Sequence, residues 1–477
     1  MIPVVTPDEM RAIDAAAPAP VEELIRRAGA AVARTALHML GGTYGRVVNV
    51  IAGVGNNGAD GRDAAARLTA RGVKVRLYEV ALCPQKLPPA DLVIDAAFGT
   101  GYKPSAERPW NAPDVGDAAV LAVDVPSGID ALTGTASSGV LPADRTITFQ
   151  ALKPGLMFGA GSRLAGAIEV VDIGLDTDHI RCHLVEVADV AAWWPARGAD
   201  AHKWHGAVKV VAGSAEMPGA AELSTAGAAR SGSGLVSLSA PGCAPRTRSE
   251  VVQRPIGTAE FADEALVDIG RFGALVIGPG LGRDDDTLTA ARQCIADAPV
   301  PVVVDGDAIF ALAWSAEGAA PLLRARELPT VLTPHDGEFS ILTGSPPGPD
   351  RIAAARAAAA RFDSTILLKG PTTVVAAPPA RSFDAPSPPT AHELIWATDE
   401  PAQVYLVDRG DQRLATAGSG DVLAGMIGAV LAANVDPTRG SAAAAWLHGA
   451  AAALGPQEGL LAGDLPDLIP VAIEALR

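Results

Sequence analysis

The chain has few aromatic residues and few charges for its length. Aromatic side chains make up 4% and charged side chains 19% of its 477 residues, whereas hydrophobic side chains make up 49%. A chain of this composition is expected to fold, which excludes an intrinsically disordered protein. It is too long for a single hydrophobic core, so two or three domains are expected.

An excess of basic residues is also absent. The formal net charge is -16, and no block of lysines and arginines interrupts the sequence. Because nucleic-acid binding needs a basic patch, we expect no nucleic-acid partner. Acidity does not exclude a phosphate ligand, since the backbone N–H groups at a helix start can hold one.

Cysteines are scarce, and no targeting segment is recognised. The four cysteines lie far apart without the paired spacing of a zinc site, so we expect free thiols. The N-terminus lacks the basic start and apolar run of a secretion signal. The most apolar stretches follow Asp421 and Arg439, and their Gly- and Ala-rich composition predicts buried core helices rather than membrane spans. We therefore expect a cytoplasmic protein with no membrane partner.

Short runs of Val, Ile and Leu alternate with Ala-rich stretches and form two series along the chain. This pattern predicts an α/β fold in which helices cover both faces of parallel sheets. The first series of expected strands comprises 47–53, 73–80, 91–97, 119–125, 145–151 and 168–173. The second comprises 208–213, 235–240, 274–278, 301–305, 330–333 and 366–369. The seam at 190–205 predicts domains at 1–195 and 200–477, and the Pro-, Ser- and Asp-rich segment 376–400 predicts a surface insertion.

The first expected strand runs into a glycine-rich turn, G-V-G-N-N-G-A-D at residues 53–60. This turn has the G-x-G-x-x-G form of a dinucleotide site, and Glu79 ends the next strand as that fingerprint requires. However, Asn56, Asn57 and Asp60 stand where a pyrophosphate would meet bare backbone. Their side chains suit hydroxyls, an amide or a cation better. The alternative is a simple turn with an Asp at a helix start.

Two further strands end in aspartates beside glycines. Asp95 precedes A-A-F-G-T-G, and Asp124 precedes V-P-S-G. The carboxyl ends of parallel strands form the ligand crevice of an open sheet, so Asp60, Asp95 and Asp124 are expected to converge there. Carboxylates in one crevice repel each other, which favours a bound cation. Singly, each Asp is equally well explained as a solvated loop residue.

With K-P-G at 153–155 and V-V-D-I-G at 170–174, these motifs closely resemble the YjeF-type N-terminal domain of NAD(P)H-hydrate epimerases, over about residues 1–190. The resemblance implies a Rossmann-like domain that interconverts the R and S forms of hydrated NADH and NADPH. It implies that Asn57, Asp95 and Ser127 hold a potassium ion and that Asp124 is catalytic. The residues implied to bind substrate are Asn56, Asn57, Gly58, Asp60, Gly99, Thr100, Gly101 and Asp124.

In the second half, T-A-G-S-G-D at residues 416–421 opens a long apolar helix. Its glycines let successive N–H groups point into one concavity, and the helix start adds positive potential, so this motif predicts a phosphate site. Asp421 can then take a proton from a hydroxyl that attacks a phosphate. The alternative is an Asp that only stabilises the helix dipole. Lys369 ends another expected strand and can face the same phosphate, although a lone Lys is mostly a solvated charge.

With H-K at 202–203, G-P-G-L-G at 278–282 and T-P-H-D-G-E at 333–338, these motifs resemble the ribokinase-like fold. The resemblance is close to the ADP- or ATP-dependent dehydratases of hydrated NAD(P)H, and it runs from about His202 to the end. It implies ADP or ATP as phosphoryl donor, with Mg²⁺, and Asp421 as catalytic base. The residues implied to bind the nucleotide are Lys369, Gly370, Thr372, Thr373, Gly418, Ser419 and Gly420. Those implied to face the hydrated substrate are Gly280, His335, Glu338 and Asp421.

The two resemblances together imply a bifunctional enzyme that repairs hydrated NADH and NADPH. The N-terminal domain would interconvert the epimers, and the C-terminal domain would phosphorylate the C6 hydroxyl of one epimer and release phosphate. We also expect a homo-oligomer. Three alternatives remain open: a vitamin-type small-molecule kinase, an N-terminal half that only binds, and a dehydrogenase that binds intact NAD at the glycine-rich turn.

Overall fold

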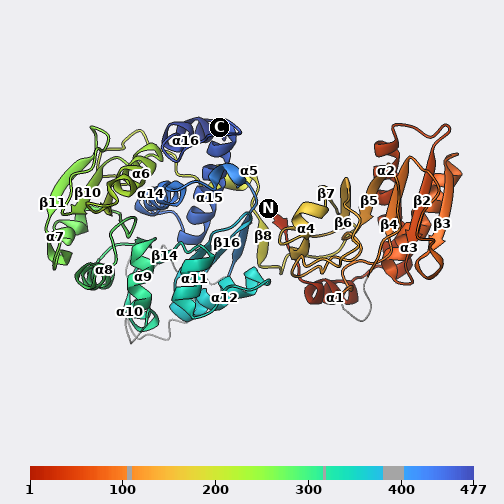
Figure 1. Cartoon of the computed structure of the whole chain (residues 1–477), viewed down its shortest axis with the longest axis horizontal. Helices are drawn as coiled ribbons and strands as arrows, with labels where there is room; N and C mark the ends of the chain where they lie inside the picture. Colours follow the sequence, from red (N-terminus) through yellow and green to blue (C-terminus); the bar gives the residue numbers. More distant parts are fainter. Residues whose placement is uncertain (105–109, 315–317, 380–401) are drawn as a thin grey trace. The chain divides into compact units, whose positions relative to one another are not determined.

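The computed structural model describes residues 1–104, 110–314, 318–379 and 402–477. Its contacts divide the chain into two compact units, one of Ile2–Cys182 and one of His183–Arg477 together with Met1. Figure 1 shows strands and helices alternating along the chain in both units. Most of the expected insertion at 376–400 lies outside the described residues.

The N-terminal unit contains a six-stranded, all-parallel sheet in the order β3-β2-β4-β5-β6-β7. All six strands expected from the sequence are present. They are β2 (Val47–Ala52), β3 (Lys74–Glu79), β4 (Leu92–Ala96), β5 (Ala119–Val123), β6 (Arg145–Phe149) and β7 (Ala167–Val171). The other elements are β1 (Ile2–Pro3), α1 (Pro7–Ala15), α2 (Val21–Leu40), α3 (Asn56–Ala70), η1 (Val80–Leu82), η2 (Pro154–Leu156) and α4 (Gly161–Leu164).

The central strands of this sheet are apolar on both faces, as their continuous Val, Ile and Leu runs predict. Val50 and Ile94 belong to one buried cluster, whereas Ile51 and Val93 belong to another. Successive residues of a strand point to opposite faces, so the two clusters cover the two sides of the sheet. Helices α2 and α3 pack against each other and against the first face.

The C-terminal unit is built on a larger mixed sheet with strands in the order β8-β17-β16-β15-β14-β13-β12-β9-β10-β11. The strands from β11 to β15 are parallel, whereas β16 is antiparallel to both β15 and β17. The six expected strands are present as β9 (Val208–Val211), β10 (Val236–Pro241), β12 (Ala274–Ile277), β13 (Val302–Val304), β14 (Thr330–Leu332) and β15 (Thr365–Leu368). The remaining ones are β8 (Cys182–Leu184), β11 (Val252–Ile256), β16 (Thr373–Ala376) and β17 (Val404–Val407).

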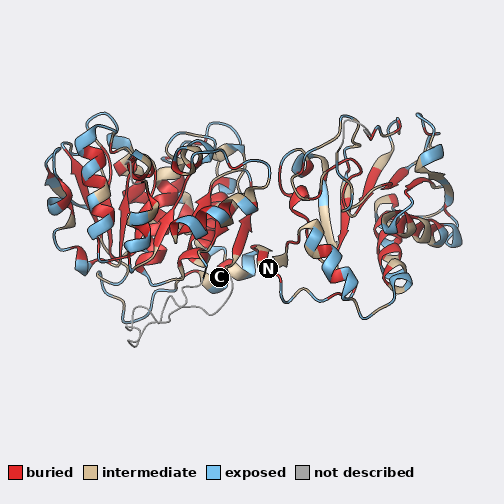
Figure 2. Ribbon diagram, turned by 90° about the horizontal axis from the view of Figure 1, so that it is seen from below, coloured by how far each residue is buried: buried red, intermediate tan, exposed pale blue. Residues whose placement is uncertain are grey.

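Helices cover this sheet, and the burial view shows buried residues on the strands and on the inward helix faces (Figure 2). The helices are α5 (Val187–Trp193), α6 (Pro218–Arg230), α7 (Ala262–Leu266), α8 (Asp285–Asp297), α9 (Asp307–Trp314), α10 (Ala320–Ala325), α11 (Asp336–Thr343), α12 (Arg351–Phe362), α14 (Ser419–Ala432), α15 (Pro437–Leu454) and α16 (Leu465–Glu474), with short turns η3 (Ile269–Arg271) and η4 (Gln412–Leu414). The two most apolar stretches form α14 and α15, which are buried as expected. Among the described residues, no helix is both long and apolar enough to span a membrane.

Helix α14 is held close to α6 by small residues. A Cβ added to Gly425 would lie 2.0 Å from the carbonyl oxygen of Ser224, and one added to Gly227 would lie 2.3 Å from that of Val422. Only glycine permits this approach of two backbones. The close packing fixes the start of α14, which carries the expected phosphate site.

The linker between the units lies earlier than the expected seam at 190–205. Strand β8 and helix α5 belong to the C-terminal unit, where the backbone N of Val185 donates to the carbonyl oxygen of Leu406 at 3.0 Å. Val190 and Trp194 are buried in the core of that unit. Strand β8 pairs with β17, which the sequence pattern did not predict, so β8 had no visible partner in the sequence.

A fragment that begins at residue 200 should therefore be less stable than one that begins at residue 181. The shorter fragment lacks β8 and α5, and burial of a large apolar side chain contributes about 1.5–3 kcal/mol. At about 2–4 °C per kcal/mol, we expect its melting temperature to be lower by about 5–10 °C. Calorimetry of the two purified fragments measures this difference. Equal melting temperatures would show that β8 and α5 add nothing to the C-terminal core.

Candidate active sites

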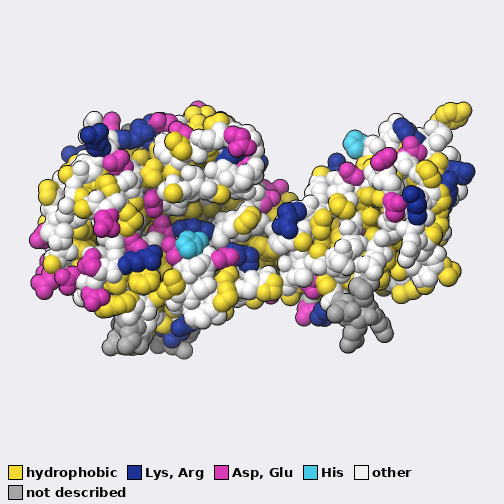
Figure 3. Space-filling view, viewed as in Figure 1, with side chains coloured by type: hydrophobic (Ala, Val, Ile, Leu, Met, Phe, Trp, Pro, Cys, Tyr) yellow, Lys and Arg dark blue, Asp and Glu magenta, His cyan; other side chains and the backbone are white. Residues whose placement is uncertain are grey.

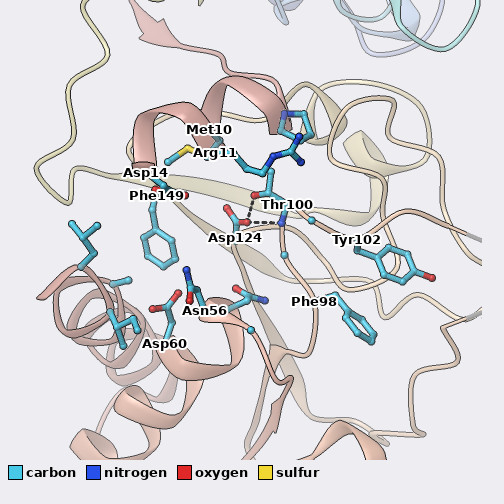
Figure 4. Close-up of a pocket in the computed structure, with 18 of the residues that line it drawn as sticks. Met10, Arg11, Asp14, Asn56, Asp60, Phe98, Thr100, Tyr102, Asp124 and Phe149 are labelled. Carbon is cyan, nitrogen blue, oxygen red and sulfur yellow. Dashed lines mark hydrogen bonds between the residues drawn. The ribbon is translucent and has the colours of Figure 1, made fainter. Parts of the chain in front are cut away.

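A cavity of about 660 Å³ opens at the carboxyl end of the N-terminal sheet. Its lining comes from α1, α2 and α3 and from the segments after β4, β5 and β6 (Figure 4). Polar residues of this lining include Asp14, Asn56, Asn57, Asp60, Thr100, Asp124 and Lys153, and apolar ones include Met10, Leu24, Ile25, Phe98 and Phe149. An apolar wall with a few convergent polar groups is the usual form of a small-molecule site.

Asp124 follows β5 in a left-handed backbone conformation, with φ of 67°. This conformation is uncommon for residues other than glycine. Thr100 holds the side chain, because its backbone N donates to Asp124 Oδ2 at 2.8 Å and its hydroxyl donates to the same oxygen. Lys153 Nζ lies 2.8 Å from the other oxygen, Oδ1. A strained residue held from both sides is typical of a functional site.

Lys153 carries a charge that is buried away from water. Its side chain is 1% exposed, and Nζ also donates to Thr148 Oγ1 at 2.8 Å and to two backbone carbonyls at 3.1 and 3.2 Å. Burial alone would raise the pKa of Asp124, but the Lys153 charge and the hydrogen bonds from Lys153 and Thr100 outweigh it. The pKa of Asp124 is therefore below its ordinary value. Asp124 is an ionised carboxylate at neutral pH.

Two further carboxyl groups face the same cavity. Asp60 projects from α3, and its burial raises its pKa to about 8, with smaller increases from the charges of Asp124, Asp63 and Asp14. Asp14 projects from α1, and burial raises its pKa, an effect that Lys153 opposes and Asp124 supports. The structure thus brings Asp60 and Asp124 together, as expected, and adds Asp14.

Asp95 does not line this cavity but is fully buried at the end of β4. Ser127 binds it twice, through its backbone N to Oδ2 at 2.9 Å and its hydroxyl to Oδ1 at 2.6 Å. Burial raises the pKa of Asp95, and the hydrogen bonds from Ser127 oppose this rise. Asn57 is in the cavity wall, and both polar atoms of its side chain are buried without a hydrogen-bond partner among the described residues. A buried amide without partners is costly, so these atoms are available to a ligand.

The second site lies at the carboxyl end of the C-terminal sheet and depends on a second buried ion pair. Lys369 follows β15, and its Nζ lies 2.6 Å from Oδ1 of Asp305, which follows β13. The hydroxyl of Thr333 donates to the same Asp305 oxygen at 2.6 Å. Burial would lower the pKa of Lys369, but the charges of Asp305 and Glu338 raise it above its ordinary value. Lys369 is therefore a fixed ammonium group.

The start of α14 meets this ammonium group. Gly418 caps the helix with φ of 91°, a conformation that glycine adopts without strain. A Cβ on Gly420 would lie 3.2 Å from Lys369 Nζ, so the ammonium group lies directly beside the N-terminus of α14. Burial raises the pKa of Asp421 to about 7, with a further increase from the Asp305 charge and an opposing effect of Lys369. An anion site thus adjoins a carboxyl group that can exchange its proton near neutral pH.

His335 and Glu338 lie at the start of α11, where each side chain accepts a hydrogen bond from the backbone of the other residue. His335 Nδ1 accepts hydrogen bonds from the backbone N of Gly337 at 3.0 Å and of Glu338 at 3.2 Å, and the Glu338 carboxylate accepts one from the backbone N of His335 at 2.9 Å. Burial raises the pKa of Glu338, and Lys369 opposes the rise. Figure 3 shows acidic, basic and histidine side chains gathered around a hollow in the C-terminal unit.

The other expected residues of this half occupy loops at the same edge of the sheet. Gly370 and Thr372 form the turn between β15 and β16, and the Thr373 hydroxyl donates to the carbonyl oxygen of Gly370 at 3.4 Å. Gly280 follows β12 with φ of 61°. The Ser419 hydroxyl donates to the carbonyl oxygen of Leu414 at 2.8 Å, so it is used within its own loop.

Three residues of these sites were not predicted as site residues. Asp305 ends an expected strand and is followed by G-D-A, so the strand-end argument applied to Asp95 and Asp124 would have found it. Lys153 belongs to a K-P-G motif, but its role depends on a contact with Asp124 that local sequence does not show. Asp14 lies in an ordinary amphipathic helix, and no pattern in the sequence singles it out.

Lys153→Met should destabilise the chain, because Asp124 would lose its buried partner at a cost of about 3–5 kcal/mol. The pKa of Asp124 is depressed, so the stabilisation exists above its unfolded-state pKa and is lost as the pH falls through its folded-state pKa. The loss should be largest at neutral pH and shrink below about pH 4. Urea unfolding at both pH values measures it.

Arg46→Met is the matched control for this prediction. Arg46 pairs with Asp91 at 2.8 Å on the surface, with the two side chains 43% and 33% exposed. An ion pair this exposed to solvent contributes little to stability, so this variant should change little. Equal losses of stability in the two variants would contradict the claim that the buried Lys153–Asp124 pair stabilises the fold more than an exposed pair does.

Comparison with known proteins gives each unit a family. The NAD(P)H-hydrate dehydratase model matches residues 208–387 and 391–474, and the model of the YjeF-related protein N-terminus matches residues 21–88 and 79–155. The bifunctional NAD(P)H-hydrate repair enzyme Nnr of Mycobacterium leprae is 36% identical over 458 residues, covering 90% of this chain and 89% of its own. The enzyme of the same name from Moorella thermoacetica is 32% identical over 501 residues, covering 92% and 90%.

A solved structure is similar to a large part of the chain. The ADP/ATP-dependent NAD(P)H-hydrate dehydratase from Bacillus subtilis, co-crystallised with ATP and Mg²⁺, is 28% identical and covers 62% of this chain and 98% of its own, with a TM-score of 0.48. The two family models confirm the expected YjeF-type N-terminal domain and the expected dehydratase domain of the C-terminal unit. With both domains in one chain and more than 30% identity over most of its length, the chain belongs to the family of bifunctional NAD(P)H-hydrate repair enzymes.

Proposed function

We propose that this chain repairs hydrated NADH and NADPH. The N-terminal unit would interconvert the R and S hydrates, and the C-terminal unit would dehydrate the S hydrate at the expense of ADP or ATP. The observation that carries the proposal is the start of α14, where a helix N-terminus, the Lys369 ammonium and a carboxyl group with a pKa of about 7 meet. Phosphoryl transfer needs positive groups around the phosphate and a base for the attacking hydroxyl.

In the C-terminal unit, Asp421 would accept the proton of the C6 hydroxyl as that oxygen attacks the terminal phosphorus of the donor. The bond from this phosphorus to the rest of the donor breaks as the new one forms. The N–H groups of α14 and Lys369 stabilise the charge on the transferred group. Phosphate leaves far more readily than hydroxide, so its departure from C6 with loss of a ring proton restores NADH or NADPH.

The nucleotide phosphates would lie between two loops, one of Lys369, Gly370, Thr372 and Thr373 and one of Gly418, Ser419 and Gly420. The hydrate would lie against Gly280, His335 and Glu338. Among the described residues, no group of three or more His, Cys, Asp and Glu side chains is placed to hold a metal. Mg²⁺ usually binds through one or two carboxylates and the phosphates of a substrate. We therefore propose that Mg²⁺ enters with the nucleotide.

In the N-terminal unit, Asp124 would act on the C6 centre of the hydrate. Thr100 and Lys153 hold its two oxygens, so the carboxylate keeps one position and stays ionised. The other residues proposed to bind the hydrate are Asn56, Asn57, Gly58, Asp60, Gly99, Thr100 and Gly101. Asn57 and Asp60 have polar groups in the cavity wall, and Gly99 packs beside Asn57 and Asp124.

A potassium ion would be held by Asn57, Asp95 and Ser127. The donor set fits, because amide, carboxylate and hydroxyl oxygens suit a hard cation. The partnerless Asn57 amide and the fully buried Asp95 carboxyl both favour such a ligand. When bound, the ion would supply the positive charge that keeps Asp95 ionised.

An ion pair at Glu79 weakens the dehydrogenase alternative. In a dinucleotide fingerprint this acidic residue binds a ribose hydroxyl. Here the Glu79 carboxylate accepts two hydrogen bonds from Arg62, at 3.1 and 2.5 Å. Arg62 also donates to the carbonyl oxygen of Gly53 at 2.8 Å, which places the guanidinium beside the glycine-rich turn. The carboxylate is therefore paired with Arg62, and the Glu79 side chain is 44% exposed.

The function is tested by incubating the chain with a mixture of R and S NADH hydrates and either ADP or ATP. We expect NADH absorbance to recover completely with at least one donor, because both epimers reach the dehydratase. Recovery that stops when the S form is exhausted would contradict the epimerase half. No recovery with either donor would contradict the dehydratase half.

Asp421→Asn should lower the dehydration rate by about 10²–10⁴-fold while nucleotide binding persists, because only the base is lost. The base must be deprotonated, so the wild-type rate should rise with pH through about 7, and this rise should be absent in the variant. Stopped-flow measurement of NADH formation across pH gives both results.

Asp285→Asn is the matched control for Asp421→Asn. Asp285 is exposed in the first turn of α8, where an aspartate has only a dipole-stabilising role. This control should keep the wild-type rate. An Asp421→Asn variant as active as the Asp285→Asn control would reduce Asp421 to the same role.

A further inference from the structure

Asp14 is a carboxyl group of the N-terminal cavity that the proposed reaction leaves without a role. It lies in the last turn of α1, and this last turn contains no basic residue. Its side chain lines the cavity, and Figure 4 shows it on the α1 side, with Asp60 and Asp124 on other walls. A negative charge at this end of a helix costs about 0.3–1 kcal/mol, so helix stability does not explain the position.

The carboxyl group of Asp14 is not engaged by a neighbouring side chain among the described residues. Among the described residues, no hydrogen bond or ion pair of its carboxyl group is found. The charged groups that face it are Lys153, Asp124 and Asp60. Lys153 is engaged with Asp124 at 2.8 Å, and Arg11, on the same helix and also in the cavity wall, is engaged with Asp8.

The pKa values of the two carboxyl groups on the α1 wall and the sheet wall are shifted in opposite directions. Lys153 and Thr100 keep Asp124 ionised. Burial raises the pKa of Asp14, and the nearby negative charge of Asp124 supports the rise against the opposing effect of Lys153. A pair of carboxyl groups whose environments separate them in this way can serve as acid and base in one site.

Epimerisation at C6 must remove the hydroxyl from one face of the ring and return one to the other face. Hydroxide is a poor leaving group and needs a proton, and the incoming water must lose one. A single carboxylate fixed at one wall does not supply both proton transfers in the same turnover. The cavity therefore needs an acid as well as the base Asp124.

We propose that Asp14 is this acid and is a second catalytic residue of the epimerase, an inference that rests on the proposed function. Asp14 gives its proton to the C6 hydroxyl, the C6–O bond breaks, and its electron pair leaves with the oxygen as water. The lone pair of the ring nitrogen forms a C=N bond to C6. Water then adds to the other face of C6, its proton passes to Asp124, and the electron pair of the C=N bond returns to nitrogen. Exchange with solvent returns the proton from Asp124 to Asp14.

The test uses the full chain, the R hydrate of NADH and excess nucleotide donor. After subtraction of spontaneous epimerisation, Asp14→Asn should consume the R hydrate about 10²–10⁴-fold more slowly than wild type. Its consumption of the S hydrate and its affinity for the R hydrate should not change. The wild-type rate should fall as the pH rises through the raised pKa of Asp14, because the acid loses its proton, and Asp14→Asn should lack this fall. Asp14→Glu, which keeps the acid, should recover part of the activity.

Asp117→Asn is the control, since it removes an exposed carboxylate of the same unit that does not line the cavity, and it should epimerise at the wild-type rate. Unchanged affinity for the R hydrate shows that the N-terminal unit of each variant is folded, and unchanged S consumption shows the same for the C-terminal unit. An Asp14→Asn variant with the wild-type rate, or one slowed only through weaker binding of the R hydrate, overturns the role of Asp14. A wild-type chain that does not exceed the spontaneous rate overturns the proposed epimerase function itself, and the inference with it.

Discussion

A buried lysine paired with an aspartate organises each of the two sites. Lys153 Nζ lies 2.8 Å from Asp124 in the N-terminal unit, and Lys369 Nζ lies 2.6 Å from Asp305 in the C-terminal unit. A buried lysine without a partner tends to lose its proton and a buried aspartate tends to gain one, so each member of a pair keeps the other charged. Both aspartates follow strands of parallel sheets, which fixes the charges at the edge where such sheets bind ligands.

Beside each ion pair lie carboxyl groups that are not part of the pair and whose pKa is raised. In the C-terminal unit this group is Asp421, whose pKa burial raises to about 7, and Lys369 beside it remains a fixed positive charge for phosphate. In the N-terminal unit the paired Asp124 is itself the proposed base, while Asp14 and Asp60 have raised pKa values. The same kind of ion pair therefore lies beside both proposed reactions, phosphoryl transfer in one unit and epimerisation in the other.

The sequence predicted the two parallel sheets because buried parallel strands are continuous apolar runs, as in V-V-V at 302–304 and L-V-I at 92–94. It did not predict β8 or β17, which have three and four residues and pair with each other far apart in the chain. Strand ends identified Asp95 and Asp124 because a carboxylate before a glycine-rich turn is visible locally. Lys153 and Asp14 were not identified, since their positions at the cavity arise only from tertiary packing.

The central claim is that the paired lysine and aspartate leave a neighbouring carboxyl group with a pKa close to neutrality. Titration of ¹³C-labelled aspartate carboxyl groups by NMR, in the wild-type chain and in Asp421→Asn, measures this most directly. One carboxyl resonance should titrate near pH 7 in the wild-type chain and be missing from the variant. If the resonance lost in the variant titrates below about pH 5, as an ordinary exposed aspartate does, the account of the C-terminal site is contradicted.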